Sequence, residues 1–169
     1  MTSPAEVLAA NLEAAYRVGQ RLIQARDRLA DVWPLDESRS PEALDDDTVV
    51  WIDAFLKRWE NFQDMLDGQL VRGVVLLEGE AERVVTRRDR ARLLEKLAIV
   101  DSAEAWFDAG QLRNQLVHGY PLSDPKQVHR INAAFGHTDL LIATFDRIRS
   151  HVGNRALAAV PVPALQSSS

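Results

Sequence analysis

The sequence predicts an all-α protein, an up-and-down bundle of about five to six helices. Two observations support this prediction. Apolar residues recur at helical spacing over most of the 169 residues, and no segment shows the sustained alternation of apolar and polar residues that marks a half-buried strand. A chain of this length forms one domain with a sizeable core, which we assign to residues 1–151.

The first helix is predicted to begin at Ser3-Pro4, because proline is favoured in the first turn, where its missing N–H costs nothing. Pro34 is expected to end this helix, and residues 34–44, which are rich in proline, serine and charge, are expected to form a loop. The apolar face of the helix follows helical spacing and consists of Leu8, Leu12, Ala15, Gly19, Leu22 and Leu29.

The second helix is predicted to begin at Asp45–Asp47, where carboxylates cap exposed amides and complement the helix dipole. One face of this helix carries Trp51, Phe55, Phe62 and Leu66. Gly68 is expected to break it. The apolar run 70–77 is compatible with a strand or a buried helix, and we predict a helix because a lone strand would have no pairing partner.

A fourth helix is predicted over residues 87–100 and a fifth over residues 103–118. Leucines at helical spacing indicate the inward face of the fourth helix. Gly119 and Pro121 are expected to end the fifth helix, because glycine supplies the left-handed cap and proline bars continuation.

The last helix is predicted to begin at Asp124-Pro125, with the aspartate as N-cap and the proline in the first turn. Its apolar face consists of Val128, Ile131, Phe135, Ile142, Phe145 and Ile148. From residue 152 the composition turns to glycine, alanine, proline and serine. We therefore predict that residues 152–169 form a disordered tail.

Charge and composition limit the functions open to the chain. The net charge of −5 argues against a non-specific nucleic-acid coat protein, although a local basic cleft would suffice for RNA cleavage. Residues 36–67 are strongly acidic and are expected to form a solvated face. Residues 83–96 are basic and are compatible with an exposed face, an RNA track or a patch for an acidic partner.

The sequence predicts a cytoplasmic protein that does not enter the membrane. No apolar run approaches the length of a membrane span, and no apolar segment follows a positively charged start as in a secretory signal. The absence of cysteine excludes disulfides and thiolate zinc sites and fits a reducing compartment. We expect no cofactor and no metal.

The end of the fifth helix combines four chemically distinct side chains: Arg113, Asn114, His118 and Tyr120. The planar guanidinium of arginine donates bidentate hydrogen bonds to phosphate oxygens. The imidazole of histidine exchanges protons near neutral pH. Together they are a minimal set for cleaving RNA without a metal, so Arg113, His118 and Asn114 are the candidate catalytic residues.

The helical periodicity predicts how this site is assembled. Ala105, Ala109, Leu112 and Leu116 fall on one stripe, which we expect to contact the core. Asn114 and His118 lie nearly opposite that stripe, on the same side as Phe107. Arg113 lies about 140° around the helix from His118, so one helix does not easily aim both at one phosphate. Fraying of the helix at Gly119, or a copy of the helix from a second subunit, would bring the two groups together, and a two-fold homodimer supplies such a copy.

The spacing of Arg113, His118 and Tyr120 resembles the signature of the HEPN superfamily, and specifically its HepT-like toxin branch. The helical pattern across about residues 5–150 supports the resemblance more loosely. The resemblance implies a dimeric helical bundle in which two motifs form a composite cleft. It also implies a metal-independent endoribonuclease, the toxin partner of a nucleotidyltransferase-type antitoxin that attaches AMP to Tyr120.

The chemistry implied by the resemblance begins with attack of a ribose 2′-hydroxyl on the adjacent phosphate. His118 would act as general base or acid. Arg113 would stabilise the added negative charge of the transition state, and Asn114 would orient the imidazole or the phosphate. Tyr120 would be a regulatory position at the mouth of the cleft.

Other interpretations of the motif remain open. A histidine at a helix end is commonly a partner of the helix dipole, and a tyrosine after a helix is commonly a packed aromatic. The chain is also compatible with a non-catalytic HEPN-like subunit that regulates a nucleotidyltransferase or binds a nucleotide, or with an unrelated helical dimer. A growth defect on expression that is relieved by Arg113→Ala or His118→Ala would fit only the ribonuclease.

Two further groups of residues are weaker candidates. His129, His137 and His151 have no metal-type spacing with one another or with carboxylates. Asp64 and Asp67 precede Gly68, where a helix break could aim a carboxylate into a cleft, although most such residues lie on the surface.

Overall fold

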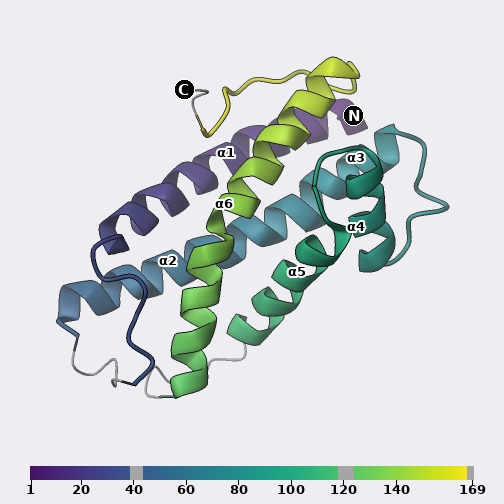
Figure 1. The fold of residues 1–169 in the computed structure, drawn as a ribbon. Coiled ribbons are helices and arrows are strands. Elements are labelled where there is room, and N and C mark those ends of the chain that lie inside the picture. The colour runs from purple at the N-terminus through teal and green to yellow at the C-terminus, as the bar shows by residue number, and fades with distance from the viewer. Residues whose placement is uncertain (39–43, 118–123, 167–169) are drawn as a thin grey trace.

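The computed structural model describes residues 1–38, 44–117 and 124–166, and these residues form helices and no strand (Figure 1). The predicted all-α class is therefore confirmed for the described residues. The helices, in chain order, are α1 (Pro4–Leu29), α2 (Asp46–Met65), the π-helical segment η2 (Leu66–Val71), α3 (Arg72–Leu77), α4 (Arg87–Lys96), α5 (Ala103–Val117) and α6 (Pro125–Asn154).

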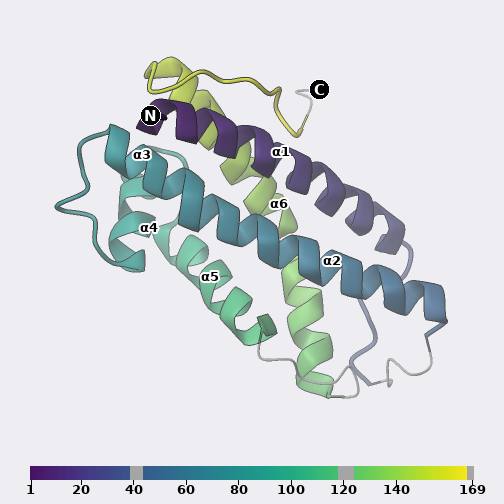
Figure 2. The ribbon, with the colours of Figure 1, turned by 180° about the vertical axis from the view of Figure 1, so that it is seen from behind.

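Helices α1 and α2 lie side by side, and α6 crosses them at a steep angle on the same side as α4 and α5 (Figures 1 and 2). The core between them is built from leucines of α1 and from large aromatic residues. Phe55, Trp59, Phe62 and Phe145 are fully buried, and Phe62 of α2 lies 6.1 Å from Phe145 of α6, measured between ring centroids. These contacts join α2 to α6 in the core.

The starts of α1, α2 and α6 follow the predicted caps. Ser3 and Glu6 form a capping box, in which the Ser3 hydroxyl accepts from the Glu6 N–H and the Glu6 carboxylate accepts from the Ser3 N–H. Asp45 caps α2 by accepting from the Thr48 N–H, and Asp124 caps α6. At each start a short polar side chain satisfies amides that the helix leaves unpaired.

The predicted break at Gly68 is wrong, because α2, η2 and α3 run on without interruption from residue 46 to residue 77. The backbone widens into a π-helix over Leu66–Val71 instead of ending. The segment 70–77 is helical, as predicted, and its buried residues Leu70, Val71, Val74 and Val75 face the core.

Helices α1 and α4 end earlier than predicted. Helix α1 ends at Leu29 and not at Pro34. Helix α4 ends at Lys96 because Ala98 adopts a left-handed conformation with φ of 57°. The N–H of Ile99 then donates to the carbonyl of Leu94 at 2.8 Å, which closes the helix in a Schellman turn.

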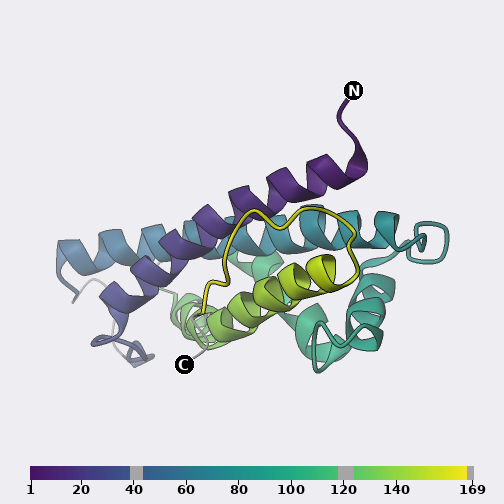
Figure 3. The same ribbon diagram turned by 90° about the horizontal axis from the view of Figure 1, so that it is seen from above.

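The C-terminal segment packs against the bundle, whereas the sequence predicted a disordered tail from residue 152. Helix α6 continues to Asn154, and the following residues up to 166 turn back along it (Figure 3). The Asp146 carboxylate accepts from the N–H of Leu165 at 2.7 Å, and the Leu165 side chain lies against Gly19 of α1. Apolar residues without helical periodicity thus find a place in the core that composition alone does not predict.

Candidate functional site

Arg113 and Asn114 lie near the C-terminal end of α5, the helix that ends at Val117. Both side chains are partly buried. His118 and Tyr120, the other two residues of the predicted site, lie outside the described residues, so the structure places only half of the motif.

The buried face of α5 is rotated from the predicted stripe. The residues buried on α5 are Trp106, Ala109, Gly110 and Leu112, whereas Ala105 and Leu116 are only partly buried. Trp106 offers more apolar surface than the small residues that defined the predicted stripe, and its burial turns the helix. Arg113 is seven residues from Trp106, about two full turns, so both side chains lie on the same side of α5. On this side Arg113 contacts Asp64 of the neighbouring helix α2.

Two carboxylates of α2 hold the Arg113 guanidinium. Its Nη2 lies 2.6 Å from Oδ2 of Asp64 and 3.8 Å from Oε1 of Glu60. The hydrogen bond that the guanidinium donates to Asp64 outweighs its desolvation and raises the pKa of Arg113 above its ordinary value. The Nε of Arg113 is buried and has no acceptor among the described residues.

Arg113 and Asn114 line a surface cavity of about 320 Å³ between α2, η2, α4 and α5. We call it the arginine cavity, because four arginines from three different helices surround it. Its lining residues are Gln63, Asp64, Asp67, Gly68, Arg72, Arg87, Arg90, Arg113 and Asn114.

The two carboxylates of the cavity are each paired with one arginine. Asp67 accepts from Arg90 at both oxygens, at 2.8 Å and 3.3 Å, and both side chains of this pair are almost buried. Asp64 is paired with Arg113. Within the described part of the chain neither Arg72 nor Arg87 has an ion-pair partner, so the cavity carries two uncompensated positive charges.

The π-helical segment carries Asp67 and Gly68 to the wall of the cavity. The sequence indicated Asp64 and Asp67 as carboxylates that a helix break could aim into a cleft. Both line the cavity, although the helix continues as a π-helix and does not break. There each carboxylate forms an ion pair with an arginine. Short π-helical stretches often occur where a helix presents functional side chains.

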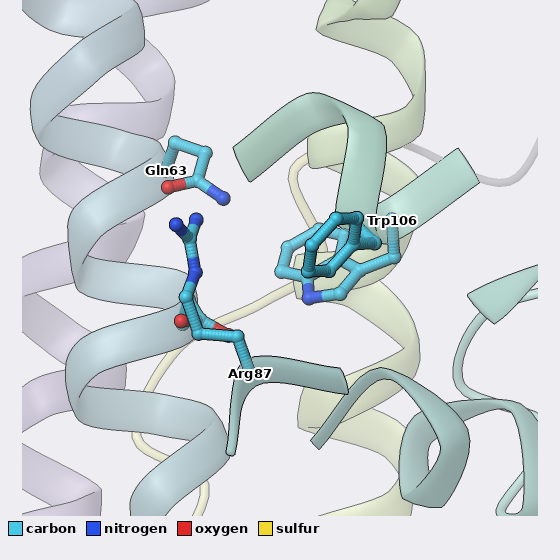
Figure 4. Close-up of a pocket in the computed structure, with 5 residues that line it drawn as sticks. Gln63, Arg87 and Trp106 are labelled. Carbon is cyan, nitrogen blue, oxygen red and sulfur yellow. The ribbon is translucent and has the colours of Figure 1, made fainter. Parts of the chain in front are cut away.

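Gln63 is a part of the site that the sequence did not indicate. It is 2% exposed, and its Nε2 has no hydrogen-bond partner among the described residues. Figure 4 shows its amide group near the guanidinium of Arg87, with the indole of Trp106 on the other side of the same closely packed space. A glutamine on an apolar helix face gives no signal of this kind in a single sequence.

The basic segment 83–96 divides into inward and outward side chains. Arg90 is buried and Arg87 is partly buried, and both line the arginine cavity, whereas Arg83 and Arg92 are exposed. The guanidinium of Arg88 lies 4.1 Å from the ring centroid of Phe107. The basic run was thus the one sequence signal for Arg87 and Arg90, and Arg72 had none.

The histidines that the structure describes do not form a second site. His129 contacts Glu37 at 3.1 Å, and His151 contacts Glu78 at 2.8 Å. Within residues 1–38, 44–117 and 124–166, no three histidine or carboxylate side chains are grouped as metal ligands would be. None of the described helices combines the length and the apolar character needed to cross a bilayer.

No family model matches the chain, and no curated protein or solved structure matches it either.

Proposed function

We propose that the chain is a metal-independent endoribonuclease of the HEPN type and the toxin of a pair with a nucleotidyltransferase-type antitoxin. The observation that supports the proposal is the position of Arg113 and Asn114 on a cavity with two uncompensated arginines. A locally positive cavity next to a motif of arginine and histidine suits a phosphodiester, even in a chain whose net charge is −5.

In the proposed reaction the ribose 2′-oxygen attacks the adjacent phosphorus, and the bond from phosphorus to the 5′-oxygen breaks. His118 takes the proton of the 2′-hydroxyl or gives a proton to the leaving 5′-oxygen. The products are a 2′,3′-cyclic phosphate and a 5′-hydroxyl. Arg113 stabilises the additional negative charge on the phosphate oxygens during the transfer.

The ion pair of Arg113 with Asp64 has a place in this mechanism. The carboxylate engages Nη2 and holds the guanidinium against α2, while Nε has no acceptor among the described residues. An arginine has five N–H donors, so a phosphate can bind without displacing Asp64. Because the carboxylate also lowers the local positive charge, Arg72 and Arg87 supply the remaining attraction.

A non-catalytic HEPN-like subunit that regulates a nucleotidyltransferase or binds a nucleotide is the second candidate. The contacts of Arg113 with Asp64 and Glu60 favour it, since they give the arginine a structural role in joining α5 to α2. This candidate shares the partner of the first but has no RNA cleavage.

Incubation of the purified protein with RNA in the presence of EDTA tests the proposal. We expect cleavage by the wild type, and His118→Ala is expected to lower the rate by about 10²–10⁴-fold. His129→Ala is the matched control, because His129 is an exposed histidine far from the arginine cavity in the sequence. Full activity of His118→Ala, or loss of activity in EDTA, would reject the mechanism.

The proposed antitoxin acts on Tyr120. An AMP group on its hydroxyl would add negative charge close in sequence to Arg113 and would compete with RNA for the guanidinium. Co-expression with a genomically adjacent nucleotidyltransferase, followed by mass spectrometry, locates the modification. Neutralisation of Tyr120→Phe by that partner would show that inhibition does not depend on this hydroxyl.

A further inference from the structure

Two groups of nitrogen donors meet in the arginine cavity without an acceptor. Gln63 is 2% exposed, and its Nε2 has no partner within the described part of the chain. The guanidinium of Arg87 points toward the same space (Figure 4) and has no carboxylate partner among the described residues. Buried donors in folded proteins are almost always paired, so an acceptor bound in the cavity would complete the hydrogen bonds of this cluster.

The charges around this space favour an anion as that acceptor. Arg72 lies at the rim of the same cavity, on α3, and like Arg87 it has no ion-pair partner among the described residues. The nearby carboxylates do not compensate these two arginines, because Asp67 is paired at both oxygens with Arg90. A neutral acceptor would leave both charges uncompensated.

The position of Arg87 depends on the residue it faces on α5. The end of its side chain lies so close to Gly110 that a β-carbon at that position would collide with Nη2. The indole of Trp106, one turn earlier on α5, lies beside the guanidinium (Figure 4). Helix α5 therefore has its smallest residue at the point where the guanidinium passes over it.

We propose that Gln63, Arg72 and Arg87 form a phosphate-binding site beside Arg113. The planar guanidinium groups and the amide supply N–H donors from three directions, which suits a tetrahedral oxyanion. The cavity of about 320 Å³ is at the lower end of the range for small-ligand sites, so it admits a phosphate with part of its sugar.

The ligand we favour is a phosphate of the RNA strand next to the one held by Arg113. In taking RNA as the source of the phosphate, this inference rests on the proposed function. A free nucleotide offers the same phosphate chemistry, and the experiment distinguishes the two sources.

Binding is measured with three probes: an uncleavable 2′-O-methyl oligoribonucleotide, AMP and pyrophosphate. The variants are Arg87→Gln and Arg72→Gln, and the matched control is Arg92→Gln, because Arg92 is an exposed arginine of α4 outside the cavity. Each cavity variant is expected to weaken binding by about tenfold or more, the usual effect of losing a hydrogen bond from a charged group. The control is expected to change it by much less.

Gly110→Ala is a second way to displace Arg87 without removing its charge. The added methyl group moves the end of a flexible side chain, so the fold is expected to persist while phosphate binding weakens several-fold. Circular dichroism and thermal unfolding establish that each variant is folded. If Arg87→Gln does not fold, Gly110→Ala and Arg72→Gln carry the test.

Tight binding of the oligoribonucleotide alone would identify a nucleic-acid backbone, and equal binding of AMP would identify a free nucleotide. Either result supports the phosphate site. Failure of all three probes to bind, or equal weakening by Arg92→Gln, would overturn it. Because the oligoribonucleotide cannot be cleaved, binding by a protein without ribonuclease activity would refute the proposed function and leave this site in place.

Discussion

At the scale of single residues, the chemistry of the cavity depends on how each arginine is compensated. Arg90 is fully compensated, because Asp67 occupies two of its donors and both side chains are almost buried. Arg113 is partly compensated, since Asp64 engages one nitrogen and leaves Nε without an acceptor among the described residues. The arginines of the cavity therefore differ in how many of their donors remain for a ligand, and the carboxylates of α2 and η2 determine this difference.

Arg113→Lys separates a catalytic from a structural role of Arg113. Lysine keeps the charge and can still pair with Asp64, which is half-exposed, so the stability is expected to change by less than about 1 kcal/mol. The planar fork is lost, and RNA cleavage is expected to fall by about 10²–10³-fold. Cleavage assays in EDTA, together with urea unfolding, check both parts. Unchanged cleavage would favour the non-catalytic subunit.

Gln63→Leu is expected to stabilise the protein. The buried Nε2 lacks an acceptor in the folded chain, and an unsatisfied buried donor costs about 1–3 kcal/mol. Leucine has a similar volume and no polar group, so the free energy of unfolding should rise by about 1 kcal/mol or more. Urea unfolding of the two proteins measures the difference. A loss of stability of similar size would show that the amide is paired in the folded state.

At the scale of helices, the sequence predicts starts better than ends. Ser3, Asp45 and Asp124 bear caps that chemistry makes recognisable, and the structure has helices beginning at all three. The end of α4 depends on the left-handed conformation of Ala98. Glycine is the usual residue in this conformation, so an alanine does not indicate a helix end in the sequence. The rotation of α5 depends on how Trp106 packs against other helices, and a single helical wheel does not contain that information.

Ala98→Gly is expected to stabilise the end of α4. A left-handed conformation costs a residue with a β-carbon about 1–2 kcal/mol, and the greater freedom of glycine in the unfolded chain offsets part of the gain. The free energy of unfolding should therefore rise by about 0.5–1 kcal/mol, as measured by thermal or urea unfolding. Ala10→Gly, at an exposed position in the helical interior of α1, is the control and should lower stability by about 1 kcal/mol. Equal effects of the two changes would contradict this explanation of the helix end.

The junction of α3 with α6 gives the fold a defined acid sensitivity. Hydrogen bonds from Arg155 and His151 hold the pKa of the Glu78 carboxyl below its ordinary value of 4.5, with Arg155 the larger cause. A carboxyl with a lowered pKa stabilises the fold above pH 4.5, and this contribution is lost as the pH falls through its value in the folded protein.

Glu78→Gln is therefore expected to lower stability at pH 7 by about 1.5–3 kcal/mol, the range for hydrogen bonds to charged groups. The difference between the variant and the wild type should shrink as the pH falls below 4.5. Unfolding free energies measured by urea across this pH range give the comparison. A difference that stays constant with pH would mean that the charge of Glu78 does not contribute.

At the scale of the whole molecule, the sequence predicts a homodimer in which the C-terminal ends of two copies of α5 meet. The partly polar face of Phe107, Asn114 and His118 suggested a second subunit. The structure covers Phe107 in part with the Arg88 guanidinium, at 4.1 Å from the ring centroid. Val117, next to His118 in sequence, is 43% exposed and is the apolar residue at the described end of the helix.

Val117→Asp is expected to convert a wild-type dimer into a monomer and to reduce RNA cleavage with it. A buried charge at an apolar contact is costly unless it is paired. Val50→Asp is the control, because Val50 is an even more exposed valine at the start of α2. Light scattering after size-exclusion chromatography measures the mass of each protein. A monomeric wild type would refute the prediction.

The π-helical segment η2 lets one residue be added to the helix without turning the residues that follow. Bonds in a π-helix join residue i to i+5, so the segment holds one more residue than the same span of α-helix. Deletion of Gly68 would remove that residue and allow a regular α-helix with the same phase after it. Val74 would therefore keep its place in the core, while the wall of the arginine cavity at Asp67 and Gly68 would change. The cavity wall can thus be altered independently of the packing of α3.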